Sequence, residues 1–191
     1  LIPSIAWSML NNDRVVISTC TKNLQSQLYT KDIPFLHKVF SYPFRTALVK
    51  GRKNYLCVRK FVQLLAEHER ELAQDEEYLA LMPTLYWASE TESGDVADCN
   101  GLLSSPMWTI VWDRISSTTS ECPGAHCPHV TSCFVRKNRA LAQLADVIIA
   151  NHSVVFSSFG QDGSALSGYR CIVFDEAHNV EDVATDCLSR S

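Results

Sequence analysis

The segment CIVFDEAH, residues 171–178, constrains the fold more than any other part of this 191-residue chain. A run of apolar residues typical of a buried strand ends in two adjacent carboxylates, Asp175 and Glu176. Ligands of open α/β sheets bind at the carboxyl ends of the strands, so this pattern predicts a site there. An Asp can hold Mg²⁺ at such an edge, the next carboxylate can activate water, and His178 on the following turn could sense a phosphate. The alternative is that Asp175 only caps the next helix.

Strand-like and helix-like segments alternate at both ends of the chain. A helix is predicted over residues 22–40 with Thr21 as its N-cap, and another follows the acidic pair. The helix-to-strand segment LAQLADVIIANHSVVF is expected to finish as a strand end at Asn151 and His152. Three further strands are predicted: RVVISTC (14–20), RTALVKG (45–51) and DVIIAN (146–151). This alternation favours an open, mostly parallel α/β sheet.

The middle of the chain, from about Gly51 to Cys133, is predicted to be a mostly helical excursion from that sheet. Apolar residues recur at helical spacing over residues 55–73 and again over 75–95. Pro83 is expected to interrupt the second helix, because proline removes a hydrogen bond from a helix interior.

Four of the eight cysteines have polar or glycine/proline-rich neighbours: Cys57, Cys122, Cys127 and Cys133. A disulfide framework is disfavoured, because such frameworks are typical of smaller, loop-rich secreted domains. Four and then five residues separate the last three cysteines, which matches neither common zinc sites nor ferredoxin clusters closely. His126 and His129 are alternative zinc ligands. The residues alone predict a metal or cluster site and leave zinc and iron–sulfur open.

Basic residues gather around these cysteines although the net charge is −4. Residues 33–66 and 122–145 contain no acid, whereas residues 67–100 contain ten acids and one Arg. A basic surface of this kind attracts phosphates, and solvated helix faces are the alternative. Tyr55 and Phe134 flank the cysteines and are candidates for base stacking, with core packing favoured. The candidate phosphate contacts are Arg52, Lys53, Arg59, Arg136 and Lys137.

The sequence VFDEAH resembles motif II of the superfamily 2 helicases, the DEAH box. That resemblance implies a RecA-like nucleoside triphosphatase with a phosphate-binding loop, G-x-x-x-x-G-K-S/T. The chain contains no such loop, and LIPSIAWSML, residues 1–10, stands where the helix after the loop is expected. We therefore expect an incomplete P-loop NTPase motor domain that does not hydrolyse ATP alone.

Several motifs occur in the order seen in the XPD/DinG-type iron–sulfur helicases, and the bacterial DinG branch looks most similar. The matching segments cover nearly the whole chain apart from its acidic middle: VVISTCTKNLQSQLYTKDIPFL, ALVKGRKNYLC, the three spaced cysteines, ADVIIANHSVVF and CIVFDEAHNVEDVA. The resemblance implies an α/β, RecA-like motor domain with an inserted, mainly helical cluster domain. The implied ligands of its [4Fe–4S] cluster are Cys57, Cys122, Cys127 and Cys133. The implied divisions are 1–50, first part of the motor domain; 51–135, cluster insertion; and 136–191, second part with the DEAH box.

The same resemblance implies an activity, namely 5′ to 3′ movement along single-stranded DNA driven by ATP and Mg²⁺. Asp175 would hold Mg²⁺, and Glu176 would activate the attacking water. The segment STCTKNLQSQL resembles motif Ia, which contacts the DNA backbone in this family. Its candidate contacts are Ser18 and Thr19 at a strand end and Thr21 and Asn23 at a helix N-terminus, where plain N-capping is the alternative.

Partners and setting also follow from the resemblance. The expected partners are single-stranded DNA, forked or displaced-strand DNA, and a second motor domain of the full-length protein, with no membrane. The expected setting is the bacterial cytoplasm, associated with the nucleoid, in DNA repair or replication-stress processing. Three alternatives stay open: a zinc-binding nucleic-acid module without motor activity, a DinG-like nuclease, and a redox sensor.

Overall fold

The computed structural model describes residues 1–70, 76–99, 106–159 and 166–189. The chain divides into two compact units, one formed by residues 1–50 with 138–191 and the other by residues 51–137. The sequence predicts a loop over residues 157–168, and its central part, residues 160–165, lies outside the described residues. None of the helices in the described part of the chain is long and apolar enough to cross a membrane.

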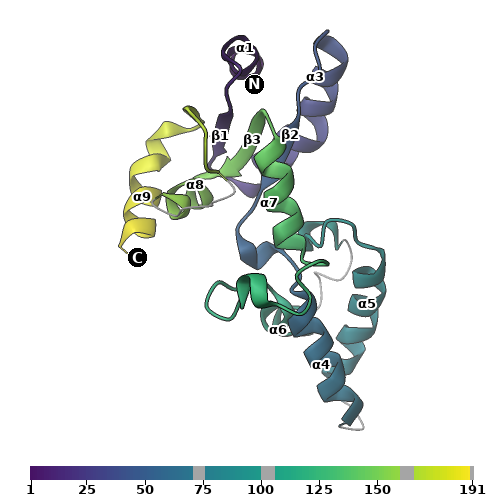
Figure 1. The fold of residues 1–191 in the computed structure, drawn as a ribbon. Helices are drawn as coiled ribbons and strands as arrows, with labels where there is room; N and C mark the ends of the chain where they lie inside the picture. Colours follow the sequence, from purple (N-terminus) through teal and green to yellow (C-terminus); the bar gives the residue numbers. More distant parts are fainter. Residues whose placement is uncertain (71–75, 100–105, 160–165, 190–191) are drawn as a thin grey trace. The chain divides into compact units, whose positions relative to one another are not determined.

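The first unit, here called the sheet unit, contains four parallel strands (Figure 1). Their order across the sheet is β2 (Thr46–Val49), β3 (Val147–Asn151), β1 (Val15–Thr19) and β4 (Cys171–Phe174). All three pairings are parallel, which confirms the α/β class and the parallel sheet predicted from the sequence. Thr19 lies opposite Asn151 and Ser18 opposite Phe174, so the carboxyl ends of β1, β3 and β4 meet at one edge.

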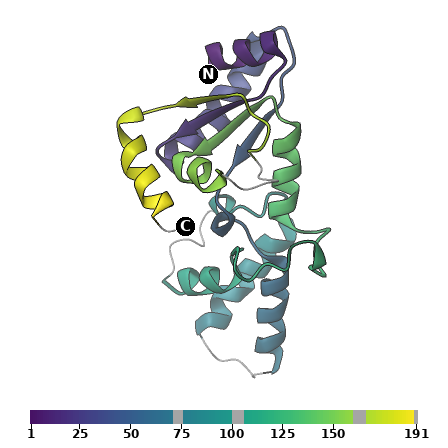
Figure 2. The same ribbon diagram turned by 60° about the vertical axis from the view of Figure 1, so that its left-hand side comes forward.

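Helices cover both faces of this sheet. They are α1 (Ile2–Asn11), α2 (Lys22–Gln27), a π-helical turn (Leu28–Asp32), α3 (Ile33–Val39), the second part of α7 (Phe134–Leu144), α8 (His152–Ser158) and α9 (Val180–Leu188). Val15 and Ile17 pack in one core with Ile5 of α1, while Val16 packs in another with Val155 of α8. Successive side chains of a strand point to opposite faces, so a strand covered on both sides reads as a continuous apolar run. Helices α8 and α9 lie side by side (Figure 2).

Local capping explains where several of these helices begin. The Thr21 side chain accepts a hydrogen bond from the Leu24 N–H at 3.2 Å, which confirms Thr21 as the N-cap of α2. The Asn151 side chain accepts one from the Val154 N–H at 2.8 Å and caps α8 in the same way. The expectation of a continuing strand end after Asn151 was therefore wrong, because this cap starts a helix at His152.

The second unit, here called the insertion unit, is mainly helical. It contains α4 (Val58–Arg70), α5 (Glu76–Glu90), α6 (Pro106–Ile115), the start of α7, and short 3₁₀ turns at Arg52–Asn54, Val96–Asp98 and Gly124–His126. Tyr55, Leu56, Phe61, Ile115 and Phe134 are among the buried residues of its core. Leu56 also pairs with Ser116 through an isolated antiparallel bridge.

Pro83 does not interrupt α5, contrary to the sequence-based expectation. Proline costs a helix interior about 3 kcal/mol, so tertiary packing has to offset the lost hydrogen bond. Leu81 and Thr84 on either side of Pro83 are buried, and the Trp87 ring packs edge-on against those of Trp108 and Trp112 on α6.

Candidate functional site

The acidic turn, residues 175–178, follows β4 at the carboxyl edge of the sheet. The Asp175 N–H donates to the Ser18 carbonyl at 2.9 Å, which extends the pairing of β4 with β1 by one residue. Glu176 has φ 47°, a left-handed conformation that is uncommon for a residue other than glycine and worth attention near a site. The side chains of Asp175, Glu176 and His178 are exposed.

The capping alternative for Asp175 is not supported. Within residues 166–189, neither the 3₁₀ turn Ala177–Asn179 nor α9 begins with a side-chain cap. The Asn179 amide instead lies 3.0 Å from Nε2 of His178 and 3.5 Å from a Glu176 carboxylate oxygen. The turn thus presents two carboxylates and a histidine to solvent at the edge where the sequence predicted them.

A buried histidine lies behind this turn. His152 is 1% exposed, and its Nδ1 lies 2.6 Å from the Ser18 hydroxyl oxygen. Its ring packs against Phe174 with centroids 5.6 Å apart. Burial lowers the pKa of His152, and the Asp175 backbone and the Asp175 and Glu176 carboxylates partly oppose that shift. Burial of the ring therefore favours the neutral form of His152 beside the acidic turn.

The four residues predicted to contact DNA from motif Ia divide into two pairs. Thr21 and Asn23 are exposed at the start of α2, where they can reach a partner. Ser18 and Thr19 are both 0% exposed, so the structure does not favour direct contacts by their side chains. The reason is that both lie inside β1, the strand with a neighbour on each side.

The four candidate cysteine ligands all lie in the insertion unit and are partly exposed. Cys57 immediately precedes α4, and its N–H donates to the Ile115 carbonyl at 2.8 Å. Cys133 immediately precedes α7 and packs against the core of the unit. Cys122 and Cys127 lie in the loop between α6 and α7, where the Cys127 carbonyl accepts the Val130 N–H at 3.1 Å. No disulfide joins any of the eight cysteines, all of which are described.

Four thiolates suit an iron–sulfur cluster, and thiolates with imidazole also suit zinc. The donor set therefore fits such a group in kind and number. Throughout the described residues, however, no three His, Cys, Asp or Glu side chains are grouped so that they could hold a metal ion. Cluster ligation by these cysteines stays a prediction.

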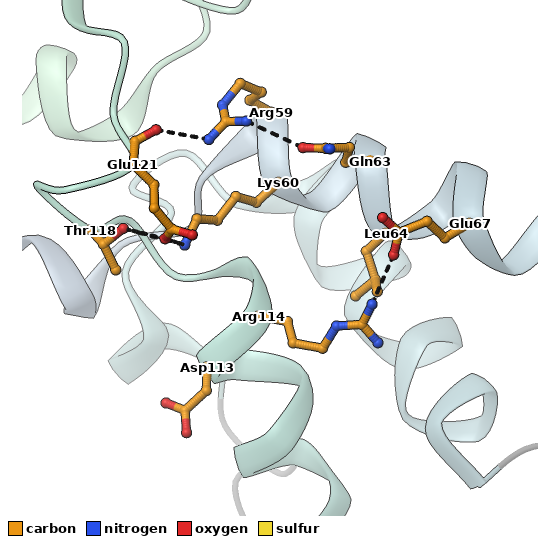
Figure 3. A pocket seen from close by; sticks show the side chains of 9 residues that line it. All are labelled: Arg59, Lys60, Gln63, Leu64, Glu67, Asp113, Arg114, Thr118 and Glu121. Atoms are coloured by element: carbon orange, nitrogen blue, oxygen red, sulfur yellow. Dashed lines mark hydrogen bonds and ion pairs between the residues drawn. The ribbon is translucent and has the colours of Figure 1, made fainter.

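A charged pocket is lined by residues of α4, α6 and the loop after α6 (Figure 3). Arg59 donates to the Glu121 carbonyl at 2.9 Å and to the Gln63 side chain at 3.2 Å. Lys60 forms an ion pair with the Glu121 carboxylate, and Thr118 donates to the same carboxylate at 2.6 Å. These contacts, which we call the Glu121 clasp, connect the residues just after Cys57 to the residue just before Cys122. The pocket is lined by Arg59, Lys60, Gln63, Leu64, Glu67, Asp113, Arg114, Thr118 and Glu121.

Three of the other basic candidates are more exposed than Arg59, whose guanidinium is engaged in the clasp. Lys53, Arg136 and Lys137 are exposed, and Arg52 is partly exposed. The Lys137 ammonium lies 5.3 Å from the centroid of the Phe134 ring, a cation–π arrangement. Tyr55 and Phe134 themselves are buried in the core, so the structure supports core packing for them and not base stacking.

Sequence reasoning missed two contacts near these sites. Glu121 is separated by 62 residues from Arg59, and the only signal was an acid directly beside an otherwise basic segment. Ser18 and His152 are 134 residues apart, and both had been noted without their contact. The alternation of strands could have suggested that second contact, because it places both residues at carboxyl ends of parallel strands.

Comparisons with known proteins agree with these motifs. Residues 113–191 match the DEAD_2 family. The chain is 32% identical over 98% of its length to the ATP-dependent DNA helicase YoaA of Haemophilus influenzae, of which it covers 29%. It is 33% identical over 97% of its length to the ATP-dependent helicase DinG of Mycobacterium tuberculosis, of which it covers 30%. It is 32% identical over its full length to the 3'-5' exonuclease DinG of Bacillus subtilis, of which it covers 20%. The resemblance is confirmed: along nearly its whole length, the chain is similar to helicases of the DinG type.

Proposed function

We propose that this chain is part of the first motor domain of an ATP-dependent DNA helicase that moves 5′ to 3′ on single-stranded DNA. The observation that carries this proposal is the acidic turn. Its two exposed carboxylates end the apolar strand β4 at the carboxyl edge of a parallel sheet, in a chain related to helicases. That edge is where open α/β sheets bind ligands, and nucleoside triphosphatases place Mg²⁺ and the attacking water there.

The residues of the turn have separate roles in this proposal. Asp175 would hold the Mg²⁺ that accompanies ATP, either directly or through water. Glu176 would orient and deprotonate the water that attacks the γ-phosphate, since a second carboxylate beside the metal ligand is suited to that task. His178, which shares Asn179 with Glu176, would face the γ-phosphate side of the site. A second motor domain of the full-length protein would complete the site.

The insertion unit would carry the cluster and a DNA-facing surface. Cys57, Cys122, Cys127 and Cys133 would hold a [4Fe–4S] cluster, which would supply iron–thiolate bonds between segments that are distant in sequence. Support comes from the donor set and from the Glu121 clasp, which joins the segments of two of these cysteines. Lys53, Arg136 and Lys137 are the exposed cations available for phosphates, together with Thr21 and Asn23 of the sheet unit. Forked or displaced-strand DNA in repair or replication-stress processing, in the bacterial cytoplasm, would be the setting.

ATP hydrolysis by the full-length protein tests the motor. We would measure steady-state hydrolysis with Mg²⁺, with and without single-stranded DNA, for the wild type, Glu176→Gln and Glu181→Gln. Glu181 is an exposed carboxylate in the first turn of α9 and serves as the matched control. The expected result is DNA-stimulated hydrolysis that Glu176→Gln lowers by about 100-fold or more and Glu181→Gln leaves intact. Equal activity of the two variants would refute the role of Glu176.

Metal analysis of protein purified without air tests the cluster separately. We expect iron and acid-labile sulfide in about equal amounts, lost on Cys122→Ser and retained on Cys187→Ser, whose thiol lies on α9. Zinc without sulfide would instead support a zinc-binding nucleic-acid module. Polarity follows from unwinding assays on partial duplexes with either a 5′ or a 3′ single-stranded tail.

A further inference from the structure

His152 joins three strand ends at the edge that carries the acidic turn. It follows β3 directly as the first residue of α8. Its Nδ1 lies 2.6 Å from the Ser18 hydroxyl oxygen on β1, and its ring packs on Phe174, the last residue of β4. The side chain is fully enclosed, so these contacts are fixed by the packing of the sheet and not by solvent.

Ser18 connects this histidine to the acidic turn. Its hydroxyl contacts His152, while its main-chain carbonyl accepts the Asp175 N–H at 2.9 Å. Ser18 is 0% exposed, so neither contact competes with water. One buried residue therefore holds both the imidazole and the first residue of the turn.

The other ring nitrogen of His152 has a different environment. Nε2 is buried and has no hydrogen-bond partner in the described part of the chain. The acidic turn begins one residue after Phe174, on which the ring packs, and the Asp175 backbone and the carboxylates of Asp175 and Glu176 raise the pKa of the imidazole against the effect of burial. Buried polar atoms in native proteins are nearly always hydrogen-bonded, so the unpaired Nε2 needs an explanation.

The tautomer of His152 follows from these surroundings. A neutral imidazole has one N–H donor and one acceptor nitrogen. The Ser18 hydroxyl at Nδ1 can donate, whereas Nε2 has no partner in the described part of the chain. The consistent arrangement has Ser18 donating to Nδ1 and the proton on Nε2.

We propose that His152 is a positioning residue for ATP hydrolysis: Ser18 fixes its tautomer, and its Nε2–H donates to the Asp175–Glu176 segment when nucleotide is bound. His152 would act through the two carboxylates and would not touch the substrate. Residues that orient a ligating or catalytic carboxylate commonly change activity by 10- to 100-fold when they are replaced. The inference rests on the proposed hydrolysis, because it assigns no role to His152 without it.

Three replacements of His152 in the full-length protein separate positioning from packing. His152→Gln places an amide nitrogen near Nε2 and loses the Ser18 contact. His152→Asn keeps an amide near Nδ1 and loses the donor toward the turn, and His152→Phe keeps the ring shape without either nitrogen. Ser18→Ala removes the hydroxyl and retains the carbonyl that Asp175 uses. For each protein we would measure kcat and KM for ATP at saturating single-stranded DNA, and the thermal unfolding midpoint.

If His152 is a positioning residue, the order of kcat among the variants should differ from the order of their thermal unfolding midpoints. His152→Asn and His152→Phe should lower kcat about 10-fold or more with KM for ATP changed less than twofold. His152→Gln should stay within about threefold of the wild type although it loses a buried contact, and Ser18→Ala should lie between. A kcat order that simply follows the unfolding midpoints, or unchanged kcat in all four variants, would overturn the inference.

The wild type and Glu176→Gln distinguish this failure from that of the proposed function. Hydrolysis by the wild type that depends on Glu176 but not on His152 would overturn the positioning role alone. A full-length wild type without DNA-stimulated hydrolysis would overturn the proposed function, and the positioning role with it.

Discussion

Replacing Gly94 with alanine tests how tightly the core of the insertion unit is packed around the cysteines. Gly94 has φ +63°, and a methyl group there would lie 2.7 Å from Cδ1 of Phe134 and closer still to Cγ and Cδ2. Phe134 is buried in the core and directly follows Cys133, so its ring cannot move without disturbing that core. The Gly94 carbonyl also accepts the Leu56 N–H at 2.9 Å, which limits movement of the loop.

The expected loss in the free energy of unfolding has two parts, and the same substitution at a second glycine, Gly124, separates them. A left-handed backbone costs a residue with a side chain about 1–2 kcal/mol. Overpacking a core typically costs a further ~1–3 kcal/mol, giving roughly 2–5 kcal/mol for Gly94→Ala. Gly124 has φ +62° with nothing within 4 Å of the added methyl group, so Gly124→Ala carries only the backbone part. The two variants should therefore differ by about 1–3 kcal/mol in the free energy of unfolding.

Urea unfolding followed by tryptophan fluorescence measures this difference. Three of the four tryptophans, Trp87, Trp108 and Trp112, form one aromatic cluster in the insertion unit, so the signal reports that unit. With a urea dependence of about 1–3 kcal/mol per molar, the midpoint of Gly94→Ala should fall below that of Gly124→Ala by roughly 1 M. Adding Phe134→Leu should recover part of the loss. Equal midpoints for the two alanine variants would refute the predicted clash.

Three further predictions concern individual side chains. Lys60 lowers the pKa of the Glu121 carboxyl below its ordinary 4.5. The clasp should therefore stabilise the insertion unit fully above about pH 4.5, and this contribution should be lost as the pH falls further. Glu121→Gln should reduce the acid dependence of the free energy of unfolding, measured by urea titrations at several pH values. Burial raises the pKa of the Cys99 thiol to about 11, so Cys99 should be alkylated more slowly at pH 8 than the partly exposed thiols of Cys20, Cys171 and Cys187, as judged by peptide mass spectrometry; comparable rates would contradict its burial. Asn151→Ala should destabilise α8 by about 1 kcal/mol and speed amide exchange near Val154, whereas Asn151→Asp, which can still cap, should not.

The sheet could be predicted because its strands are short apolar runs, and those of β1 and β3 are buried on both faces. The runs that contain Val15, Ile148 and Ile172 are recognisable from their own residues. The order of the strands could not be predicted, because β2 pairs with β3 across the whole insertion and no local pattern encodes that pairing. Parallel pairing itself follows from the helices that connect the strands.

Two local errors in the sequence-based assignment have tertiary or capping causes. Pro83 was expected to interrupt a helix, but burial of its neighbours Leu81 and Thr84 outweighs the lost hydrogen bond. The segment from Asn151 was expected to be the end of a strand. The cap at Asn151 and the burial of Val155 and Phe156 make it a helix instead.

For the basic candidates, too, the sequence did not predict which side chains are engaged by distant partners. Arg59 has the charge and the position expected of a phosphate contact. The structure instead ties its guanidinium to the Glu121 carbonyl and to Gln63. Only the partner, 62 residues away, distinguishes Arg59 from an available cation such as Lys53. Charge patterning therefore predicted a basic region without predicting which of its members remain accessible.

The acidic turn could be predicted from the sequence, but the contact between Ser18 and His152 behind it could not. The register of the sheet explains the difference. Asp175 and Glu176 are adjacent, so one strand end brings them together whatever the rest of the chain does. Ser18 and His152 meet only because β1 and β3 pair with Thr19 opposite Asn151. A slip of one residue would turn Ser18 toward the other face of the sheet and remove the contact. The buried apolar side chains of both strands set that register, so the contact behind the site depends on residues that take no part in it.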